Sequence, residues 1–240
     1  MLRGVRLEVF PGEIVGLVGQ SGSGKSTLAL AILQLLSHTG ARVSGRTMLL
    51  GQDLTGCDEH KLRDIRGRLV SLIPQSPATS LNPALRISTQ LREAWRAHSR
   101  EPWSGQRQRV SHLLTTAGLS PEDEFLRRFP SEISVGQAQR VLIVMALLHS
   151  PPLLIADEPT SALDVITQRE VLDLLVTIGK ERHMSILFIS HDLPAVAVLC
   201  HRLAILHAGE IVECGPVHRV LRAPEHEYTK RLMATVPKWE

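Results

Sequence analysis

The feature that most constrains the fold is a glycine-rich stretch, Gly19 to Thr27, that fits the pattern G-x-x-x-x-G-K-[ST]. An apolar run rich in β-branched residues, Ile14 to Val18, comes before it, and an apolar segment, Leu28 to Leu33, follows it. The first run predicts a buried strand and the second a buried helix. Strand, loop and helix in this order predict a phosphate-binding loop, because glycine lets backbone N–H groups converge on an anion without a Cβ clash.

Each residue of this stretch has a predicted part in nucleotide binding. Lys25 brings a positive charge that reaches the β- and γ-phosphates of a nucleotide such as ATP, and the Ser26 hydroxyl is a ligand for Mg²⁺. The alternative is an ordinary turn rich in glycine and serine, which the complete match and the correct flanking segments argue against. The predicted nucleotide-binding residues are Gly19, Gln20, Ser21, Gly22, Ser23, Gly24, Lys25, Ser26 and Thr27.

The amino-acid composition limits the classes of protein to which the chain can belong. The 240-residue chain is 43% hydrophobic and can bury a full core. Its net charge of +3 comes without a basic tract interleaved with aromatic residues, so nucleic acid is not predicted as a partner. The longest apolar run, Val141 to Leu148, is too short to span a bilayer, and any membrane association must come through a partner. The three scattered cysteines, Cys57, Cys200 and Cys214, predict free thiols.

Apolar runs that alternate with helical patterns predict an α/β domain with a mostly parallel sheet covered on both faces. Ligands of such sheets bind at the carboxyl ends of the strands, where the glycine-rich loop lies. Further strands are predicted at 5–9, 43–50, 69–73, 153–156, 185–189, 202–206 and 211–214, the last two as a hairpin, and helices at 59–66, 137–148 and 165–181.

The middle of the chain differs from the rest in its residue pattern. Prolines punctuate residues 76–134, and the helical patches between them are polar, which predicts a mostly helical lobe inserted into the core. We therefore expect one domain of the P-loop NTPase (RecA-like) type with a small antiparallel β part. Its predicted parts are a nucleotide-binding core at 1–75 and 136–216, the helical lobe at 76–135 and a C-terminal tail at 217–240.

Polar side chains follow three of the predicted strands. Asp157 and Glu158 end one strand, and we expect Asp157 to hold Mg²⁺ or its water and Glu158 to act as the general base for an attacking water. His191 ends another strand, from where it can contact the γ-phosphate and orient that water. Gln75 also follows a strand, and its amide can ligate Mg²⁺. A surface acidic pair, a filler histidine and a loop glutamine are the alternatives for these residues taken alone.

In combination, these residues resemble the motifs of the ATPase subunit of an ABC transporter, in the same order and over essentially the whole chain. A finer resemblance, carried by Ile73–Pro83 and Ala223–Thr229, is to the oligopeptide, dipeptide and nickel importers. The matching motifs are Walker A (Gly19–Thr27), the Q-loop (Gln75), the signature (Ile133–Gln137), Walker B (Leu153–Asp157 with Glu158), the D-loop (Ser161–Asp164) and the switch histidine (His191).

The resemblance implies an activity and partners. It implies an ATP-hydrolysing subunit that powers import of peptides or nickel, and that lies on the cytoplasmic face of the inner membrane through permease subunits. An extracytoplasmic solute-binding protein would feed the permeases. A second ATPase subunit, often non-identical, would close head to tail on this one, so that Ser134, Gly136 and Gln137 serve the partner's nucleotide, and Asp164 would lie at the seam.

The chain departs from the family pattern at two places. Val135 stands where the signature usually has glycine, and because a β-branched residue takes positive φ poorly and adds bulk, we expect a weakened composite site. The family usually has an aromatic residue that stacks on adenine in a strand before Walker A, and Phe10 lies too close to the Walker A strand to replace it. We expect either that the true start lies upstream or that adenine is held loosely.

Two other functions fit part of the pattern. A catalytically weak, nucleotide-binding partner of a second ATPase subunit is favoured by Val135 and the short N-terminus, whereas Glu158 and His191 argue against it. A soluble ABC ATPase of DNA repair or translation usually carries a long coiled-coil insertion or a second cassette. A 240-residue chain with one P-loop has room for neither.

Overall fold

The structure, a computed structural model, describes residues 1–36 and 40–234. The chain forms two compact units. The first consists of Met1–Arg66 and Ser185–Glu240, and the second of Gly67–Met184. Each unit is described separately below.

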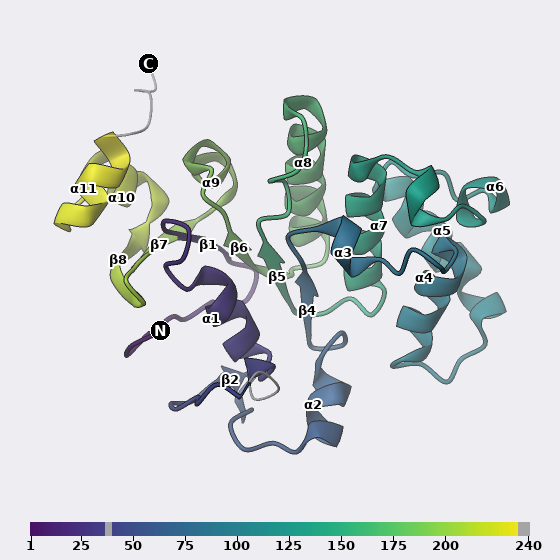
Figure 1. The fold of residues 1–240 in the computed structure, drawn as a ribbon, viewed down its shortest axis with the longest axis horizontal. Coiled ribbons are helices and arrows are strands. Elements are labelled where there is room, and N and C mark those ends of the chain that lie inside the picture. The colour runs from purple at the N-terminus through teal and green to yellow at the C-terminus, as the bar shows by residue number, and fades with distance from the viewer. Residues whose placement is uncertain (37–39, 235–240) are drawn as a thin grey trace. The chain divides into compact units, whose positions relative to one another are not determined.

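The larger sheet of the first unit has four strands among the described residues. β1 (Ile14–Val18) pairs in parallel with β6 (Ser185–Ile189) on one side and with β7 (Arg202–His207) on the other, and β8 (Glu210–Pro216) pairs antiparallel with β7 (Figure 1). Every residue of β1 and β6 is buried, as expected for strands whose two faces are both covered. The predicted hairpin of the last two strands is confirmed.

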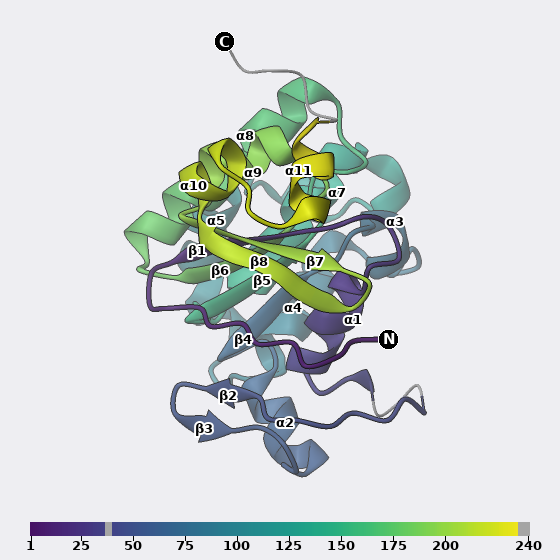
Figure 2. The same cartoon turned by 90° about the vertical axis from the view of Figure 1, so that its left-hand side faces the viewer.

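The first unit also contains helices. α1 (Lys25–Ile32) follows the glycine-rich loop, and α9 (Leu193–Leu199) follows β6. α2 (Glu59–Ile65), predicted from the sequence, begins after Asp58, whose carboxylate accepts from the Lys61 N–H. Figure 2 shows two short helices beside the β7–β8 hairpin, α10 (Val217–Arg222) and α11 (Glu227–Ala234), where the sequence predicted only a tail.

Two predicted strands of the first unit are wrong in whole or in part. Residues 5–9 alternate between half-buried and exposed, but they form no strand, because their backbone lacks a ladder of partners. The backbone hydrogen bonds near this segment are isolated. For example, the Arg3 N–H donates to the Gly209 carbonyl (2.8 Å). The strand predicted at 43–50 shortens to β2 (Met48–Leu49), paired antiparallel with β3 (Gln52–Asp53).

The second unit contains a parallel pair of strands, β4 (Val70–Ile73) and β5 (Leu153–Asp157), and two long helices, α7 (Val135–Leu147) and α8 (Val165–Glu181). α7 begins two residues earlier than predicted because Ser134 caps it. Between β4 and α7 lie α3 (Pro77–Ser80), α4 (Ile87–Arg96), a 3₁₀ turn η2 (Trp103–Gln106), α5 (Arg107–Thr116), α6 (Asp123–Leu126) and a second 3₁₀ turn η3 (Pro130–Glu132).

These intervening helices confirm the predicted helical character of residues 76–134. Their apolar positions recur at helical spacing and are buried, for example Ile87, Leu91 and Trp95 along α4. The division of the chain into core, lobe and tail at the predicted boundaries stays a prediction.

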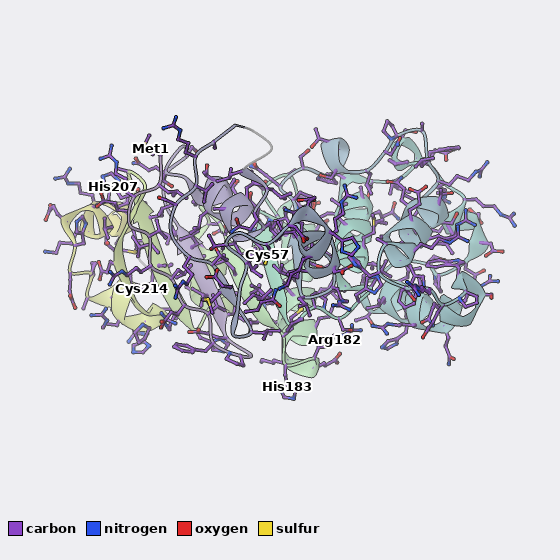
Figure 3. All side chains as sticks on the ribbon, turned by 90° about the horizontal axis from the view of Figure 1, so that it is seen from below. Met1, Cys57, Arg182, His183, His207 and Cys214 are labelled. Atoms are coloured by element: carbon purple, nitrogen blue, oxygen red, sulfur yellow. The ribbon has the colours of Figure 1, made fainter. Side chains whose placement is uncertain are left out.

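The three cysteines are free thiols, as predicted. Cys57 lies in the loop before α2 and Cys214 lies in β8, apart from each other in the first unit (Figure 3). Burial raises the pKa of the Cys200 thiol well above its ordinary value, so this cysteine behaves as a packed apolar side chain. Among the described residues, no helix combines the length and apolar character that crossing a bilayer requires.

Candidate nucleotide-binding and hydrolysis site

The glycine-rich loop connects the carboxyl end of β1 to the first turn of α1 (Figure 1). Gly22 and Gly24 have φ values of +79° and +107°, a region that side chains with a Cβ rarely adopt. The Ser23 N–H donates to the Gln20 carbonyl (3.1 Å), which closes the turn, and the Leu28 N–H donates to the Gly24 carbonyl (2.8 Å), which starts the helix. The loop thus has the curled backbone that the sequence predicts.

Glycine is required at position 19, the first of the loop, because neighbouring atoms lie too close for a side chain. A Cβ at Gly19 would lie 2.2 Å from the Leu206 carbonyl oxygen of β7 and 2.7 Å from Ser23 Oγ. Any side chain there would push the loop away from the strand beside it. The path of the loop is therefore fixed by the neighbouring strand as well as by its own turn.

Lys25 and Ser23 show that the loop fits a phosphate. The Lys25 side chain is buried, and its Nζ donates to the carbonyls of Gly19 (2.8 Å) and Gln20 (3.2 Å), so the ammonium lies inside the curl. Ser23 Oγ is buried and has no hydrogen-bond partner among the described residues. A buried positive charge and a buried hydroxyl within a ring of backbone amides suit a polyphosphate. The exposed hydroxyls of Ser26 and Thr27 lie on the first turn of α1.

His191 lies at the same edge of the first unit as the loop. β1 and β6 are neighbours in register, with Leu17 opposite Ile189, and the Ser190 N–H donates to the Leu17 carbonyl (3.2 Å). His191 follows directly and is exposed, and Asp192 caps α9 by accepting from the Ala195 N–H (3.2 Å). The structure therefore brings the switch histidine to the strand end beside the phosphate-binding loop.

The second unit brings Gln75 and Glu158 into contact. β4 and β5 run in parallel with Ile73 opposite Ala156, and the Gln75 amide Nε2 donates to Glu158 Oε2 (2.8 Å). Asp157, one residue earlier, is buried with 8% exposure. Glu158 has a positive φ of 46°, and its carbonyl accepts from the Ser161 N–H (3.2 Å) and hydroxyl (3.1 Å). A non-glycine residue in this conformation costs energy that the surrounding bonds must offset, a pattern that clusters at functional sites.

The residues predicted to bind magnesium carry oxygen atoms of the kinds that the ion prefers. Carboxylate, amide and hydroxyl oxygens are the ligands that Mg²⁺ prefers in proteins. Within the second unit Asp157 carries a carboxylate and Gln75 an amide oxygen, and within the first unit Ser26 carries a hydroxyl. Their joint action on one ion stays a prediction.

The signature residues form the start of α7. The Gln137 N–H donates to Ser134 Oγ (3.1 Å), and the Ser134 N–H donates to Gln137 Oε1 (3.0 Å), which makes a reciprocal capping box. A Cβ at Gly136 would lie 2.6 Å from Thr167 Cγ2, so the first turns of α7 and α8 touch there. The Asp164 carboxylate caps α8, and the backbone N–H of Thr167 is the main cause that holds its pKa below the ordinary value.

The argument from positive φ at Val135 is wrong. Val135 is the first residue of α7 and is not among the residues with positive φ, because the chain turns at Ser134 (φ −68°, ψ 159°) and enters the helix directly. Its side chain is 53% exposed. The expectation of a weakened composite site now depends only on the bulk of the Val135 side chain, which lies at the surface beside Ser134.

One contact to the glycine-rich loop was missed from the sequence. The Gln20 N–H donates to the hydroxyl of Tyr228, which is 208 residues away along the chain (3.2 Å). Tyr228 lies in α11, within the segment predicted only as a tail, and nothing near it in the sequence indicates contact with the loop.

Comparison with known proteins identifies the family of this chain. The sequence profile described as "ABC transporter" matches residues 2–161, more than half of the chain. The chain is 44% identical over 237 residues to the peptidoglycan transport ATP-binding protein YejF of Agrobacterium fabrum, covering 98% of this chain and 43% of that protein. It is 39% identical over 235 residues to the dipeptide transport ATP-binding protein DppD of Escherichia coli, covering 98% and 72%. This chain thus spans less than half the length of the first relative.

A solved structure confirms the fold class. The dimeric, post-hydrolysis structure of the ATP-binding cassette MJ0796, bound to ADP and Pi, superposes with a TM-score of 0.78 and 28% identity, covering 90% of each chain. The predicted α/β P-loop NTPase fold with a mostly parallel sheet and a small antiparallel part is therefore correct. The profile match and the similarity to DppD show that the chain belongs to the ABC transporter family.

Proposed function

We propose that this chain hydrolyses ATP to energise the import of peptides, as a subunit on the cytoplasmic face of the inner membrane. The observation that carries the proposal is the Glu158 carboxylate, held at 2.8 Å by Gln75 and adjacent to Asp157. A catalytically silent subunit has no need to keep this carboxylate. The relatives named for peptidoglycan and dipeptide transport favour a peptide over nickel as the cargo.

The residues divide the chemistry among themselves. In the first unit, Lys25 and the loop amides bind the β- and γ-phosphates, and the His191 imidazole contacts the γ-phosphate and orients the attacking water. In the second unit, Glu158 accepts a proton from that water as general base, and the Gln75 amide holds the carboxylate in place. Ser26, Asp157 and Gln75 would hold Mg²⁺, which would supply positive charge to neutralise the phosphate oxygens.

The partner in the composite site is a second ATP-binding subunit that meets the signature face. Around that face the side chains of Val135, Val165 and Ile166 are 53%, 82% and 74% exposed, and the Gly136–Thr167 contact makes the two helix starts neighbours. Exposed apolar residues gathered in one place favour an interaction surface. The Ser134 hydroxyl and the first amides of α7 beside them suit a phosphate held by the partner's loop.

Replacing both Val165 and Ile166 with serine is expected to weaken ATP-dependent self-association, because the association buries their apolar surface. We expect an increase in the dimer dissociation constant of about tenfold or more, measured by analytical ultracentrifugation of the Glu158→Gln variant in MgATP. The matched control is Val198→Ser on α9, an apolar residue of the first unit that is 75% exposed. Equal dimer dissociation constants for all three proteins would contradict the proposed surface.

Replacing Val135 with glycine is expected to raise the turnover of the assembled transporter severalfold. The helix tolerates valine at this position, so the gain comes from removing the bulk beside Ser134 that a partner's phosphate would meet. The measurement is ATP hydrolysis by the assembled transporter at saturating MgATP. Val198→Gly, a change of the same kind at an exposed valine of α9, serves as the control. An unchanged rate for Val135→Gly would show that the valine does not limit the composite site.

The transport function is tested by uptake in cells that lack the gene. We expect uptake of a labelled dipeptide or oligopeptide to be lost, restored by the wild-type gene and not restored by Glu158→Gln. Nickel uptake is measured in parallel. If the cells without the gene lose nickel uptake but keep normal peptide uptake, the cargo is nickel and not a peptide. If they take up both normally, the proposed transport function is wrong.

A further inference from the structure

The C-terminal segment reaches the phosphate-binding loop through one side chain. The Tyr228 hydroxyl of α11 accepts the Gln20 N–H at 3.2 Å, and Gln20 is the residue that follows the first glycine of the loop. Figure 2 shows α11 next to the β7–β8 hairpin, so the contact belongs to one end of the first unit. An amide of the nucleotide-binding loop is therefore oriented by a residue from the far end of the sequence.

The Tyr228 ring is held by the strand that also supports the loop. Its ring stacks on the His207 imidazole with centroids 3.8 Å apart and planes 22° apart. His207 is the last residue of β7, and the residue before it, Leu206, is the one whose carbonyl blocks any side chain at Gly19. The aromatic stack and the start of the loop thus rest on two consecutive residues of one strand.

A buried carboxylate fixes the turn that precedes Tyr228. Glu213 on β8 is 7% exposed, and its two oxygens accept the N–H groups of Glu225 (3.0 Å) and His226 (3.1 Å). Burial alone would raise the pKa of the Glu213 carboxyl, but these donors outweigh burial and hold the pKa below its ordinary value. The Tyr228 N–H donates to His226 Nδ1 (3.1 Å), and Thr229 is fully buried.

The Tyr228 hydroxyl contacts Gln20 at the edge of a cavity and not within a packed core. Gln20 is exposed, and Gln20, His207 and Tyr228 line a cavity of about 660 Å³ together with Arg231. A tyrosine that only filled space would have no need to direct its hydroxyl to a loop amide at the edge of a cavity. The stack positions the ring, and the hydroxyl sets the direction of the Gln20 peptide.

We propose that Tyr228 is a positioning residue for nucleotide binding, whose hydroxyl holds the start of the phosphate-binding loop in its binding-competent path. The inference rests on the proposed ATP binding by this loop. Orienting the Gln20 peptide in advance lowers the ordering cost that the nucleotide must otherwise meet. The residue acts through the loop and touches no reacting atom.

The test is Tyr228→Phe, which keeps the ring on His207 and removes only the hydroxyl. We expect the dissociation constant for MgATP, measured by calorimetry, to rise about threefold to tenfold, the effect of losing one hydrogen bond. The KM for ATP rises with it, while kcat stays at the wild-type value. The melting temperature without nucleotide stays within about 2 °C of wild type, because the stack and the Glu213 anchor remain.

The outcomes separate this inference from the proposed function. If wild type and Lys25→Ala both fail to bind MgATP, the proposed function fails. If wild type binds and Tyr228→Phe has the same dissociation constant, the positioning role is overturned. A lowered melting temperature with an unchanged dissociation constant also overturns it, because the hydroxyl would then be purely structural.

Discussion

Replacing Glu158 with glutamine is expected to lower the steady-state rate of ATP hydrolysis by about 100-fold to 10,000-fold, the range typical of losing a general base. The amide has nearly the same shape as the carboxylate but cannot accept a proton from water. The binding groups of the first unit, such as Lys25 and the loop amides, are untouched, so the affinity for MgATP stays at the wild-type level. Phosphate release measures the rate, and calorimetry measures the affinity.

The control for this variant is Glu181→Gln, which removes an exposed carboxylate at the last residue of α8 in the same unit. We expect wild-type turnover from the control. Gln75→Ala gives a further check, because it removes the amide that lies 2.8 Å from Glu158 Oε2 and should lower kcat by a smaller factor. If Glu158→Gln hydrolysed ATP at the wild-type rate, the proposed general base would be wrong.

Replacing Lys25 with alanine is expected to weaken MgATP binding by about 100-fold. Charge-assisted hydrogen bonds contribute about 1.5–3 kcal/mol each, and every 1.4 kcal/mol corresponds to a factor of ten in affinity. Without nucleotide the same ammonium holds the Gly19 and Gln20 carbonyls at 2.8 Å and 3.2 Å. The variant should therefore also unfold at a lower temperature than wild type in the absence of ATP. Calorimetry and thermal unfolding measure the two effects.

The matched control for Lys25 is Lys180→Ala, an exposed lysine in the last turn of α8. It removes one positive charge from the chain without touching the loop, and we expect unchanged binding and a melting temperature close to wild type. Binding by Lys25→Ala at wild-type affinity would show that the loop does not hold the phosphates.

The glycine-rich loop and the strand ends could be predicted because their signals are local. The apolar runs of β1, β5 and β6 are continuous, as expected for strands buried on both faces, and each is followed directly by its polar residues. Gln75 and Glu158 were each predicted at the end of a strand, and because β4 and β5 pair in parallel the two side chains meet at 2.8 Å.

The sequence predictions were wrong or incomplete where a local pattern was misleading or where the structure depends on residues far apart in the chain. Residues 5–9 alternate as a half-exposed strand would, yet a strand also requires a partner, which no pattern within five residues reveals. At Val135 the glycine of the usual motif suggested positive φ, whereas the Ser134 capping box starts the helix there. The Tyr228 contact joins residues 208 positions apart, and only the folded chain brings them together.

The most direct test of the account is phosphate release from MgATP by the purified wild-type chain over a range of concentrations. A second copy of the chain carries both the loop and the signature face, and we expect it to serve as the partner in vitro. The account predicts hydrolysis whose rate per subunit rises with protein concentration, as a composite site requires. Binding of MgATP without phosphate release at any concentration would contradict it and would favour a catalytically weak partner subunit.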